Sequence, residues 1–274
     1  MKFRVIRLVE TFFKIFVRVI SKGPLWFPFS ASAIVELRQR TSLTGSTTEP
    51  LIFHTPNDRC LYRADSLFTK EPETIAWIDS FVEDSVFWDV GACVGTYSIY
   101  AAARKKVRVI AVEPSVFNLE WLAKNVNANA LAHRVTIVPL ALSTKAQIAN
   151  FNMQVTEWGG ALSSFGVDYN HEGEAFIPKF IYSTIGCSVE FLIEKYDLPQ
   201  PDFIKIDVDS IEHLVLQGMG STIRAVKSVA LENSRNDQVR QACVEFLNAS
   251  GFVVTHVGRA NTIWSRNDWV VSAS

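Results

Sequence analysis

The sequence has few cysteines and no paired cysteine motif. Its four cysteines, Cys60, Cys93, Cys187 and Cys243, are far apart and none belongs to a CxxC pair. This spacing argues against a zinc site or a disulfide framework and is typical of free thiols in a reducing compartment. The five histidines show no metal-ligand spacing either, so we expect no metal site built from these residue types.

Long uninterrupted apolar runs are also absent. Charged residues interrupt the apolar amino-terminal segment throughout, at Arg7, Glu10, Lys14 and Arg18. This pattern excludes a transmembrane span, and no apolar h-region precedes a small-residue cleavage site. The net charge of −1 gives no general attraction to nucleic acid. We therefore expect a cytoplasmic protein with no nucleic-acid partner.

Residues 1–22 instead predict a basic amphipathic helix. Polar residues three or four positions apart form one stripe, and phenylalanine, valine and isoleucine fill the remaining face. Such a helix suits peripheral contact with the inner face of a membrane, and packing on its own domain or on a second subunit is the alternative. Gly23 and Pro24 end the helix. Residues 23–49, which include a Ser/Thr-rich run, are predicted to be a connector.

Residues 50–274 predict one α/β domain. The chain is 48% hydrophobic and 20% charged, which is typical of a globular protein. We predict strands at Leu51–His54, Val86–Val90, Val107–Val112, Val135–Pro139, Phe203–Val208, Ser228–Glu232, Val253–Val257 and Thr262–Ser265. We predict helices at Pro72–Val82, Thr96–Arg104, Ser115–Asn127, Ser188–Tyr196, Ile211–Met219 and Asp237–Ser250. This alternation favours a parallel sheet with helices on both faces, closed by an antiparallel hairpin of the last two strands.

A strand, a tight turn and a helix start mark a candidate ligand site. Asp89 lies at the carboxyl end of the first strand of this block, and the turn Gly91–Gly95 leads directly into a helix at Thr96. This layout presents backbone N–H groups to a ligand at the edge where α/β sheets bind their ligands. Glu113 ends the next strand, at the distance where such folds place an acid against ribose hydroxyls. The pair predicts a nucleoside-binding site.

Five motifs then occur in a fixed order. They are Asp89-Val90-Gly91-Ala92-x-x-Gly95-Thr96-Tyr97-Ser98, Glu113-Pro114-Ser115, Asn125-Val126-x-x-Asn129, Pro139-Leu140-Ala141-Leu142-Ser143 and Phe203-Ile204-Lys205-Ile206-Asp207-Val208-Asp209-x-Ile211-Glu212. Over about residues 50–265 the chain resembles the FkbM family of S-adenosylmethionine-dependent methyltransferases. The resemblance implies a Rossmann-like class I methyltransferase sheet of about seven strands, with helices on both faces and the last strand antiparallel. It also implies S-adenosyl-L-methionine as the cofactor.

The resemblance implies a set of cofactor contacts as well. The amino-acid end of the cofactor would lie at the glycine turn, its ribose at Glu113 and its adenine beside the residues that follow the third strand. The predicted contacts are Asp89, Gly91, Cys93, Gly95, Thr96, Glu113, Pro114, Ala141 and Leu142. Two positions depart from the family pattern, which usually has Asn where Cys93 stands and Gly where Ser210 stands. These departures concern the shapes of the two turns more than the fold.

Alternating charges after the strand that begins at Phe203 are the candidate catalytic groups. Lys205, Asp207 and Asp209 share one direction if the strand continues that far. Methyl transfer to a hydroxyl group needs a base, for which we predict Asp207 first and Asp209 second, with Lys205 as an ion-pair partner. A purely structural ion-pair cluster is the alternative. A Mg²⁺ site of Asp207, Asp209 and Glu232 is a lesser hypothesis.

Substrate contacts are predicted from the elements around this edge. Residues 150–187 contain Gly159-Gly160 beside an aromatic residue and predict a flap over the site, with a surface hairpin as the alternative. The predicted substrate residues are Trp158, Ser163, Glu212 and Glu232. His54 and Arg63 precede the first strand of the alternating block and are further candidates, although surface-loop positions are the simpler interpretation.

The resemblance implies a hydroxyl group of a sugar, polysaccharide or polyketide-like small molecule as the acceptor. A non-catalytic scaffold that docks through residues 1–22 is one alternative. A nicotinamide-dependent dehydrogenase is another, but the turn Gly91–Gly95 lacks the middle glycine of the GxGxxG fingerprint. The sequence does not identify the acceptor or the oligomeric state.

Overall fold

A computed structural model describes residues 41–43, 50–209, 211–267 and 269. The helix predicted for residues 1–22, most of the connector at 23–49 and Ser210 lie outside the described residues, so the expectations for them stay predictions. In the described part of the chain, no helix is long and apolar enough to cross a membrane.

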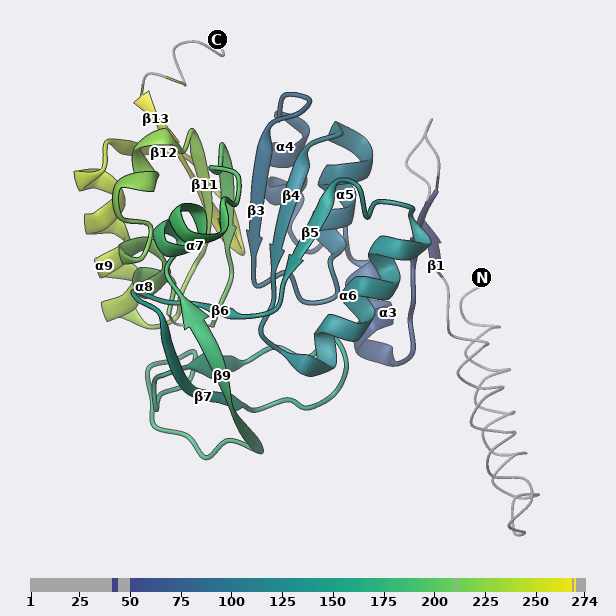
Figure 1. Ribbon diagram of the computed structural model, residues 1–274, viewed down its shortest axis with the longest axis horizontal. Helices are drawn as coiled ribbons and strands as arrows, with labels where there is room; N and C mark the ends of the chain where they lie inside the picture. The colour runs from purple at the N-terminus through teal and green to yellow at the C-terminus, as the bar shows by residue number, and fades with distance from the viewer. Residues whose placement is uncertain (1–40, 44–49, 210, 268, 270–274) are drawn as a thin grey trace. The chain divides into compact units, whose positions relative to one another are not determined.

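Seven strands form the main sheet, in the order β12-β13-β11-β10-β3-β4-β5 (Figure 1). Their bounds are Val86–Val90 for β3, Arg108–Val112 for β4, Val135–Val138 for β5, Phe203–Ile206 for β10, Ser228–Glu232 for β11, Phe252–Val257 for β12 and Asn261–Arg266 for β13. Strands β11, β10, β3, β4 and β5 run parallel, whereas β13 is antiparallel to both β11 and β12. The predicted parallel sheet with a closing antiparallel hairpin is thereby confirmed.

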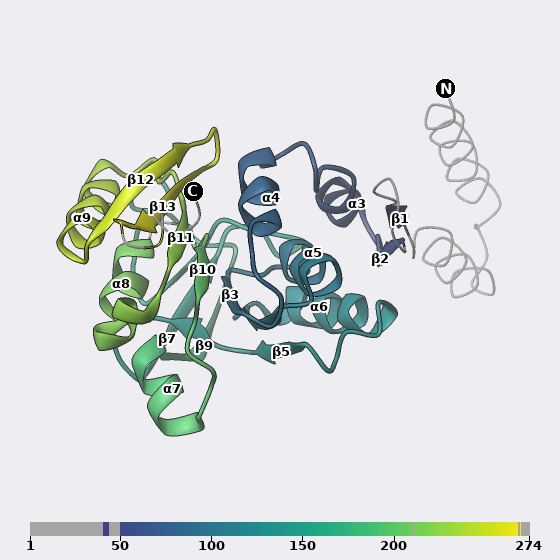
Figure 2. The same cartoon turned by 90° about the horizontal axis from the view of Figure 1, so that it is seen from above.

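Helices cover both faces of this sheet (Figure 2). Helices α4, α5 and α6 pack on one face and α7, α8 and α9 on the other. Their bounds are Pro72–Asp79 for α4, Thr96–Lys105 for α5, Val116–Ala128 for α6, Val189–Tyr196 for α7, Glu212–Gln217 for α8 and Asp237–Ala249 for α9. A short 3-10 helix, Gly220–Ala225, follows α8. The described residues thus contain two separate apolar cores, one on each side of the sheet.

The strand period decides which core each side chain enters. Successive residues of a strand point to opposite faces. Phe87 of β3 and Phe203 of β10 therefore lie in the core beneath α4–α6, while Trp88 and Ile204 lie in the other. Phe203 stacks on Phe81 with 4.0 Å between ring centroids. The charged residues two positions further along, Asp89 and Lys205, consequently point toward α4 and α5.

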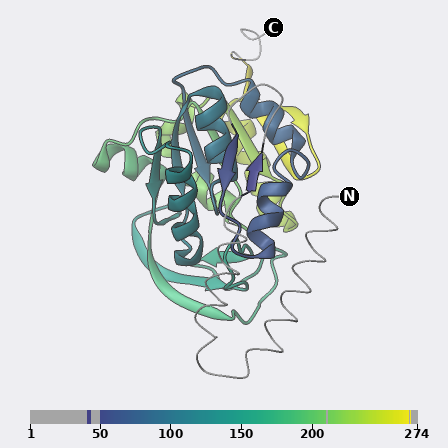
Figure 3. The same cartoon turned by 90° about the vertical axis from the view of Figure 1, so that its right-hand side faces the viewer.

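A second sheet lies beyond the carboxyl ends of the parallel strands (Figures 1 and 3). It has the order β6-β9-β7-β8, with bounds Ala141–Leu142 for β6, Gln147–Met153 for β7, Ser163–Phe165 for β8 and Phe180–Cys187 for β9. The sequence predicts a flap or a surface hairpin over residues 150–187. The structure shows instead that both ends of this segment belong to a four-stranded sheet with a small core of its own, which includes Phe151 and Phe165.

Two further elements differ from the sequence-based expectation. The predicted strand Phe203–Val208 ends at Ile206, so Asp207 and Asp209 lie in the loop that follows β10. Helix α3, Asp58–Asp65, is absent from the predicted elements; it begins where the Asn57 side chain accepts a hydrogen bond from the Cys60 N–H. Asn at the N-cap satisfies an otherwise unpaired helix N–H, and this cap allows the helix to begin within a sequence that reads as a turn.

Two asparagine side chains, one in helix α6 and one just after its end, connect the segment before the main sheet with the glycine turn. Asn125 is buried, accepts from the His54 N–H at 2.7 Å and donates to the Val94 carbonyl at 2.9 Å. One turn later, Asn129 exchanges two hydrogen bonds with the backbone of Ile52 in strand β2, Leu51–Phe53, which pairs antiparallel with β1, Thr41–Leu43. The motif Asn125–Asn129 is therefore a backbone clamp.

We predict that Asn125→Ala lowers the free energy of unfolding by about 2–4 kcal/mol, because it leaves a buried N–H and a buried carbonyl without partners. The matched control is Asn127→Ala, which removes an exposed amide from the same helix and should change stability by less than about 0.5 kcal/mol. Urea unfolding followed by circular dichroism measures both. Equal effects of the two substitutions would contradict the clamp.

Candidate active site

A cavity of about 230 Å³ lies where the parallel strands of the main sheet end. The predicted site residues that line it are Gly91, Cys93, Glu113, Pro114, Ala141, Leu142, Ser163, Asp207, Asp209 and Glu232. The predicted residues that do not line it are Asp89, Gly95, Thr96, Trp158, Lys205 and Glu212. The cavity is also lined by Arg63 and by four residues that were not predicted as site residues: Lys70, Asn118, Phe151 and Leu162.

Gly91 brings two strand ends into direct backbone contact. Its φ is +84°, and a Cβ at this position would lie 1.9 Å from the carbonyl oxygen of Asp207. Any side chain would therefore push the turn after β3 away from the loop after β10. Two turns that are far apart in sequence form one continuous wall of the cavity because this residue is glycine.

Cys93 occupies a left-handed position in the same turn, with φ of +53°. Asn tolerates this conformation better than Cys does, which accounts physically for the Asn that the resembled family usually carries there. The Cys93 N–H donates to Glu113 at 2.7 Å. Burial raises the pKa of the Cys93 thiol to about 12, so the thiol stays protonated and contributes packing rather than nucleophilic chemistry.

Glu113 is held by backbone and side-chain donors around its buried carboxylate. It accepts from the N–H groups of Cys93 at 2.7 Å and Ser115 at 2.8 Å, and from Asn118 at 3.5 Å. Burial raises the pKa of Glu113 to about 7, against the opposing effect of these hydrogen bonds. A carboxylate has about four acceptor positions, so this arrangement leaves room for a hydroxyl donor from the cavity.

Asp89, Gly95 and Thr96 support the turn from behind. Asp89 is buried, accepts from the Ser98 hydroxyl at 2.6 Å, and has a pKa raised by burial. Gly95, with φ of +85°, packs against Leu122 so closely that a Cβ would lie 2.5 Å from that side chain. Thr96 is the buried first residue of α5. The roles predicted for these residues as direct contacts stay predictions, while their positions are those of a scaffold for the turn.

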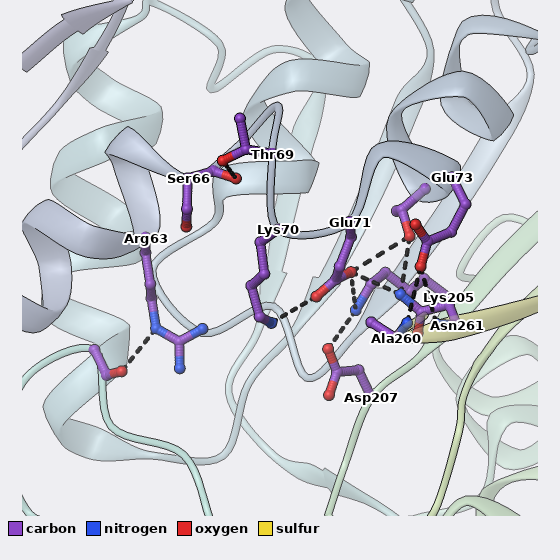
Figure 4. A network of polar contacts seen from close by, with 12 residues as sticks. Arg63, Ser66, Thr69, Lys70, Glu71, Glu73, Lys205, Asp207, Ala260 and Asn261 are labelled. Atoms are coloured by element: carbon purple, nitrogen blue, oxygen red, sulfur yellow. Dashed lines mark hydrogen bonds and ion pairs between the residues drawn. The ribbon is translucent and has the colours of Figure 1, made fainter. Parts of the chain in front are cut away.

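Lys205 is the centre of a buried charge network (Figure 4). Its Nζ lies 2.5 Å from Asp207, 4.0 Å from Glu71 and 5.0 Å from the ring centroid of Tyr97, and the side chain is only 1% exposed. Burial alone would lower the pKa of Lys205, but Asp207, Glu71 and Asp89 outweigh burial and raise it. Lys205 is therefore charged, and it acts as the ion-pair partner of Asp207 beneath the cavity floor.

Glu71, just before helix α4, joins this network to the far end of the sheet. It accepts from Lys70 at 2.6 Å through one oxygen and from Asn261 at 2.7 Å through the other. Glu73, two residues later, accepts from the N–H groups of Ala260 and Asn261 (Figure 4). No local sequence pattern indicates Glu71, because its role depends on Lys205. That residue is 134 positions away, and only the strand register directs it toward α4.

The three carboxyl groups around the strand ends differ in protonation. Burial alone would raise the pKa of Asp207, but the charges of Lys205 and Lys70 outweigh it and hold the pKa well below its usual range. Burial and the charge of Asp207 raise the pKa of Asp209 to about 6. Burial, followed by the charges of Asp207 and Asp209, raises the pKa of Glu232 well above its ordinary value. Glu232 also hydrogen-bonds to Asp207, and this contact contributes to the rise of its pKa.

Asp209 fastens residues 159–165, which we call the flap, to the loop after β10. Its Oδ2 accepts from the N–H of Leu162 at 2.6 Å and of Ser163 at 3.2 Å. Leu162 and Asp209 both have positive φ, +63° and +57°, which orients these amides and the carboxylate toward each other. Asn118 and Arg63 hold the start of the same segment through Gly159. The segment is therefore attached to α3, to α6 and to the loop after β10.

Two predicted substrate residues lie away from the cavity. Trp158 packs edge-to-face on Trp121 with 5.3 Å between ring centroids, and Glu212 is fully buried at the start of α8. Among the residues that the structure describes, no group of three or more His, Cys, Asp or Glu side chains is arranged to hold a metal ion. This finding gives no support to the Mg²⁺ hypothesis for Asp207, Asp209 and Glu232.

We predict that Gly91→Ala lowers the free energy of unfolding by about 2–4 kcal/mol, because a steric clash adds to the strain of a positive φ. Gly251→Ala is the matched control, since Gly251 has φ of +83° with no atom within 4 Å of an added Cβ and should lose only about 1 kcal/mol. Chemical unfolding of both variants measures the difference. Equal losses would show that the contact with Asp207 is unimportant.

We predict that Asp209→Ala speeds hydrogen exchange at the Leu162 amide about 10- to 100-fold, because it removes a charge-assisted acceptor. Asp209→Asn keeps one carbonyl oxygen and should have a smaller effect. The Gly166 amide, which donates to the Asn150 carbonyl at 2.9 Å, is the internal reference and should be unchanged. Unaltered exchange at Leu162 would rule out this attachment.

Comparison with known proteins agrees with the sequence resemblance. The family model for the FkbM methyltransferase domain matches residues 89–254, which is more than half of the chain. The hexuronic acid methyltransferase AglP of Haloferax volcanii is 25% identical over 150 residues, and the match covers 55% of this chain and 56% of that relative. The chain therefore matches little more than half the length of that relative.

Similar solved structures include two methyltransferases. A precorrin-6y C5,15-methyltransferase from Geobacter metallireducens is 17% identical, with a TM-score of 0.42 and coverage of 71% of this chain and 85% of that one. The M. capricolum TrmK structure in complex with S-adenosyl-homocysteine is 10% identical, with a TM-score of 0.41 and coverage of 70% and 67%. Likeness at this level carries no argument about function.

The family match supports the methyltransferase interpretation and gives no support to the dehydrogenase or scaffold alternatives. It begins at Asp89, at the end of β3, and extends into β12, so it includes the glycine turn, Glu113 and the loop after β10. The chain belongs to the family of FkbM methyltransferase domains.

Proposed function

We propose that this chain is an S-adenosyl-L-methionine-dependent O-methyltransferase that acts on a sugar or another glycan. The observation that carries the proposal is the cavity that brings Glu113 and Asp207 together around Gly91 at the carboxyl edge of the sheet. A cofactor that carries ribose hydroxyl groups and, on the neighbouring C5′ carbon, a positively charged sulfur needs acceptors for hydroxyl groups and a nearby anion. Both are present on the cavity wall.

The residues present fit this cofactor. The turn at Gly91 leaves no side chain between the backbone and the cavity. The spare acceptor capacity of Glu113 suits ribose hydroxyls, and Ala141, Leu142 and Pro114 offer an apolar surface for a purine ring. Asn118, which no sequence motif indicates, donates hydrogen bonds to both Glu113 and the Gly160 carbonyl and so helps to orient both. These side chains would hold the nucleoside.

When bound, the cofactor supplies a methyl carbon made electrophilic by the adjacent sulfonium. The residues of this chain provide the surroundings of that group. Asp207, kept ionised by Lys205, places a negative charge at the end of β10, where it favours a cationic centre. The segment Ala161–Phe165 lies over the cavity and limits the access of water to it. Positioning of this kind supplies much of the rate of a displacement reaction.

The acceptor proposal draws on the relative as well as on the cavity. The Haloferax volcanii protein is named for a hexuronic acid, which supports a sugar acceptor for this chain. The part of the cavity formed by Ser163, Asp209 and Glu232 carries polar groups suited to sugar oxygens. The sequence resemblance favours a hydroxyl group as the methylated position, and Asp209 would then be the better base, since its pKa of about 6 exceeds that of Asp207.

We predict that the chain binds S-adenosylhomocysteine and that the affinity rises about 10-fold from pH 6 to pH 8. The pKa of Glu113 is raised to about 7, so its carboxylate is largely ionised only above that pH and then accepts hydroxyl donors better. Isothermal titration calorimetry at the two pH values measures the effect. Glu113→Gln is the matched control and should bind more weakly with little dependence on pH. Absence of binding by the unaltered chain at both pH values would overturn the proposed function.

A further inference from the structure

Two cations line the cavity on its open side. Arg63 comes from helix α3 and Lys70 from the segment before α4, and both side chains border the cavity. Figure 4 shows the two side chains extending from their backbones toward the level of Asp207. The Lys70 side chain keeps 39% of its surface exposed, so solvent reaches this part of the cavity wall.

Both cations keep donors available. Arg63 uses Nε for the Gly159 carbonyl at 2.7 Å, and in the described part of the chain its two terminal nitrogens donate to no protein acceptor. Lys70 donates once, to Glu71 at 2.6 Å, and an ammonium group has three donors. The Gly159 contact also fixes the guanidinium plane, which favours recognition of a planar anion with two oxygens.

The carboxylates of the same cavity already have partners. Asp207 is paired with Lys205 at 2.5 Å, Asp209 holds the amides of Leu162 and Ser163, and Glu113 holds those of Cys93 and Ser115. Arg63 and Lys70 are the cavity-lining cations that keep donors for a ligand, and the ligand that complements them is an anion.

The same arrangement is poorly suited to removing a proton from a hydroxyl group. Asp207 is a weak base because Lys205, 2.5 Å away, stabilises its ionised form, and Glu232 is engaged in a hydrogen bond with Asp207. Protonation of Asp209 would weaken its bonds to the flap amides. An acceptor that is already ionised at neutral pH avoids this requirement, and a sugar carboxylate, with a pKa of about 3–4, is such an acceptor.

We propose that Arg63 and Lys70 form a carboxylate-binding subsite and that the acceptor is an acidic sugar methylated on its carboxylate. This inference rests on the proposed methyl transfer and narrows its acceptor. A carboxylate oxygen forms the new C–O bond with the methyl carbon while the C–S bond breaks, and the electron pair of that bond stays on sulfur. The negative carboxylate and the positive sulfonium become a neutral methyl ester and a neutral thioether, and no proton is released.

The test uses the full chain with a matched acceptor pair, phenyl β-D-glucuronide and phenyl β-D-glucoside, at millimolar concentration. Transfer from S-adenosylmethionine with a tritiated methyl group is followed, and the product is then treated with mild alkali, which hydrolyses methyl esters to volatile methanol and leaves methyl ethers intact. We expect at least about 10-fold faster transfer to the glucuronide, the scale of one charge-assisted contact, with the label released as methanol.

Three variants assign the subsite. Arg63→Gln and Lys70→Gln should each slow transfer to the glucuronide about 10- to 100-fold, with S-adenosylhomocysteine affinity kept within about 2-fold of the unaltered chain. Arg59→Gln is the matched control, because Arg59 lies one turn earlier on α3, pairs with Glu157 at 2.9 Å and does not line the cavity. It should leave both measurements unchanged.

Each other outcome overturns the inference in a recognisable way. Alkali-stable label, equal transfer to both acceptors, or no transfer to either by a chain that binds S-adenosylhomocysteine would reject a carboxylate acceptor. If Arg63→Gln weakens S-adenosylhomocysteine binding but leaves 5′-methylthioadenosine binding intact, the subsite serves the carboxylate of the cofactor. Failure of the unaltered chain to bind S-adenosylhomocysteine would instead reject the proposed function itself.

Discussion

The structure depends on a buried ammonium group, that of Lys205. A lysine on a central parallel strand, 1% exposed, is tolerable only if carboxylates surround it, since an unpaired charge in an apolar interior costs several kcal/mol. Asp207 and Glu71 meet this need from the following loop and from the start of α4. The Asp207 side chain is itself 26% exposed. The network therefore places a negative charge at the cavity, and Lys205 holds that charge in position.

The backbone contact at Gly91 depends on the absence of one side chain and joins several strand ends. The turn after β3 and the loop after β10 touch because Gly91 has no side chain. The same turn donates the Cys93 N–H to Glu113 at the end of β4. Three neighbouring strand ends thereby share one set of contacts, and the cavity has a rigid floor that does not depend on long side chains. The opposite side of the cavity is formed by residues 159–163, which are attached by Asn118, Arg63 and Asp209.

The electrostatics divide the cavity into two parts. The carboxylates at the strand ends are held by Lys205 or by backbone amides, whereas Arg63 and Lys70 have donors to spare. A cationic cofactor and an anionic acceptor would therefore each find a complementary environment. Asp207 is a poor base because Lys205, which keeps it ionised, also lowers its affinity for a proton.

The sequence by itself determined the strand and helix alternation, the antiparallel closing hairpin and the edge at which the site forms. These features follow from local periodicity and from motifs such as Gly91–Gly95, which constrain the chain over a few residues. The sequence also indicated Glu113, Asp207 and Asp209, since each lies at or just beyond the carboxyl end of a predicted strand. It did not predict helix α3 or the second sheet, because an Asn cap and long-range strand pairing have weak local signals.

Only the tertiary structure decided which charges meet. Glu71, Lys70 and Asn118 gave no signal because their partners are distant in sequence, and Lys205 pairs with Glu71 only because the strand register directs it toward α4. Asp209 faces the flap rather than standing free because β10 ends at Ile206 and the following loop turns through a positive φ. Trp158 and Glu212 lie away from the cavity for a similar reason: aromatic packing and helix burial place them, and neither effect can be inferred from spacing.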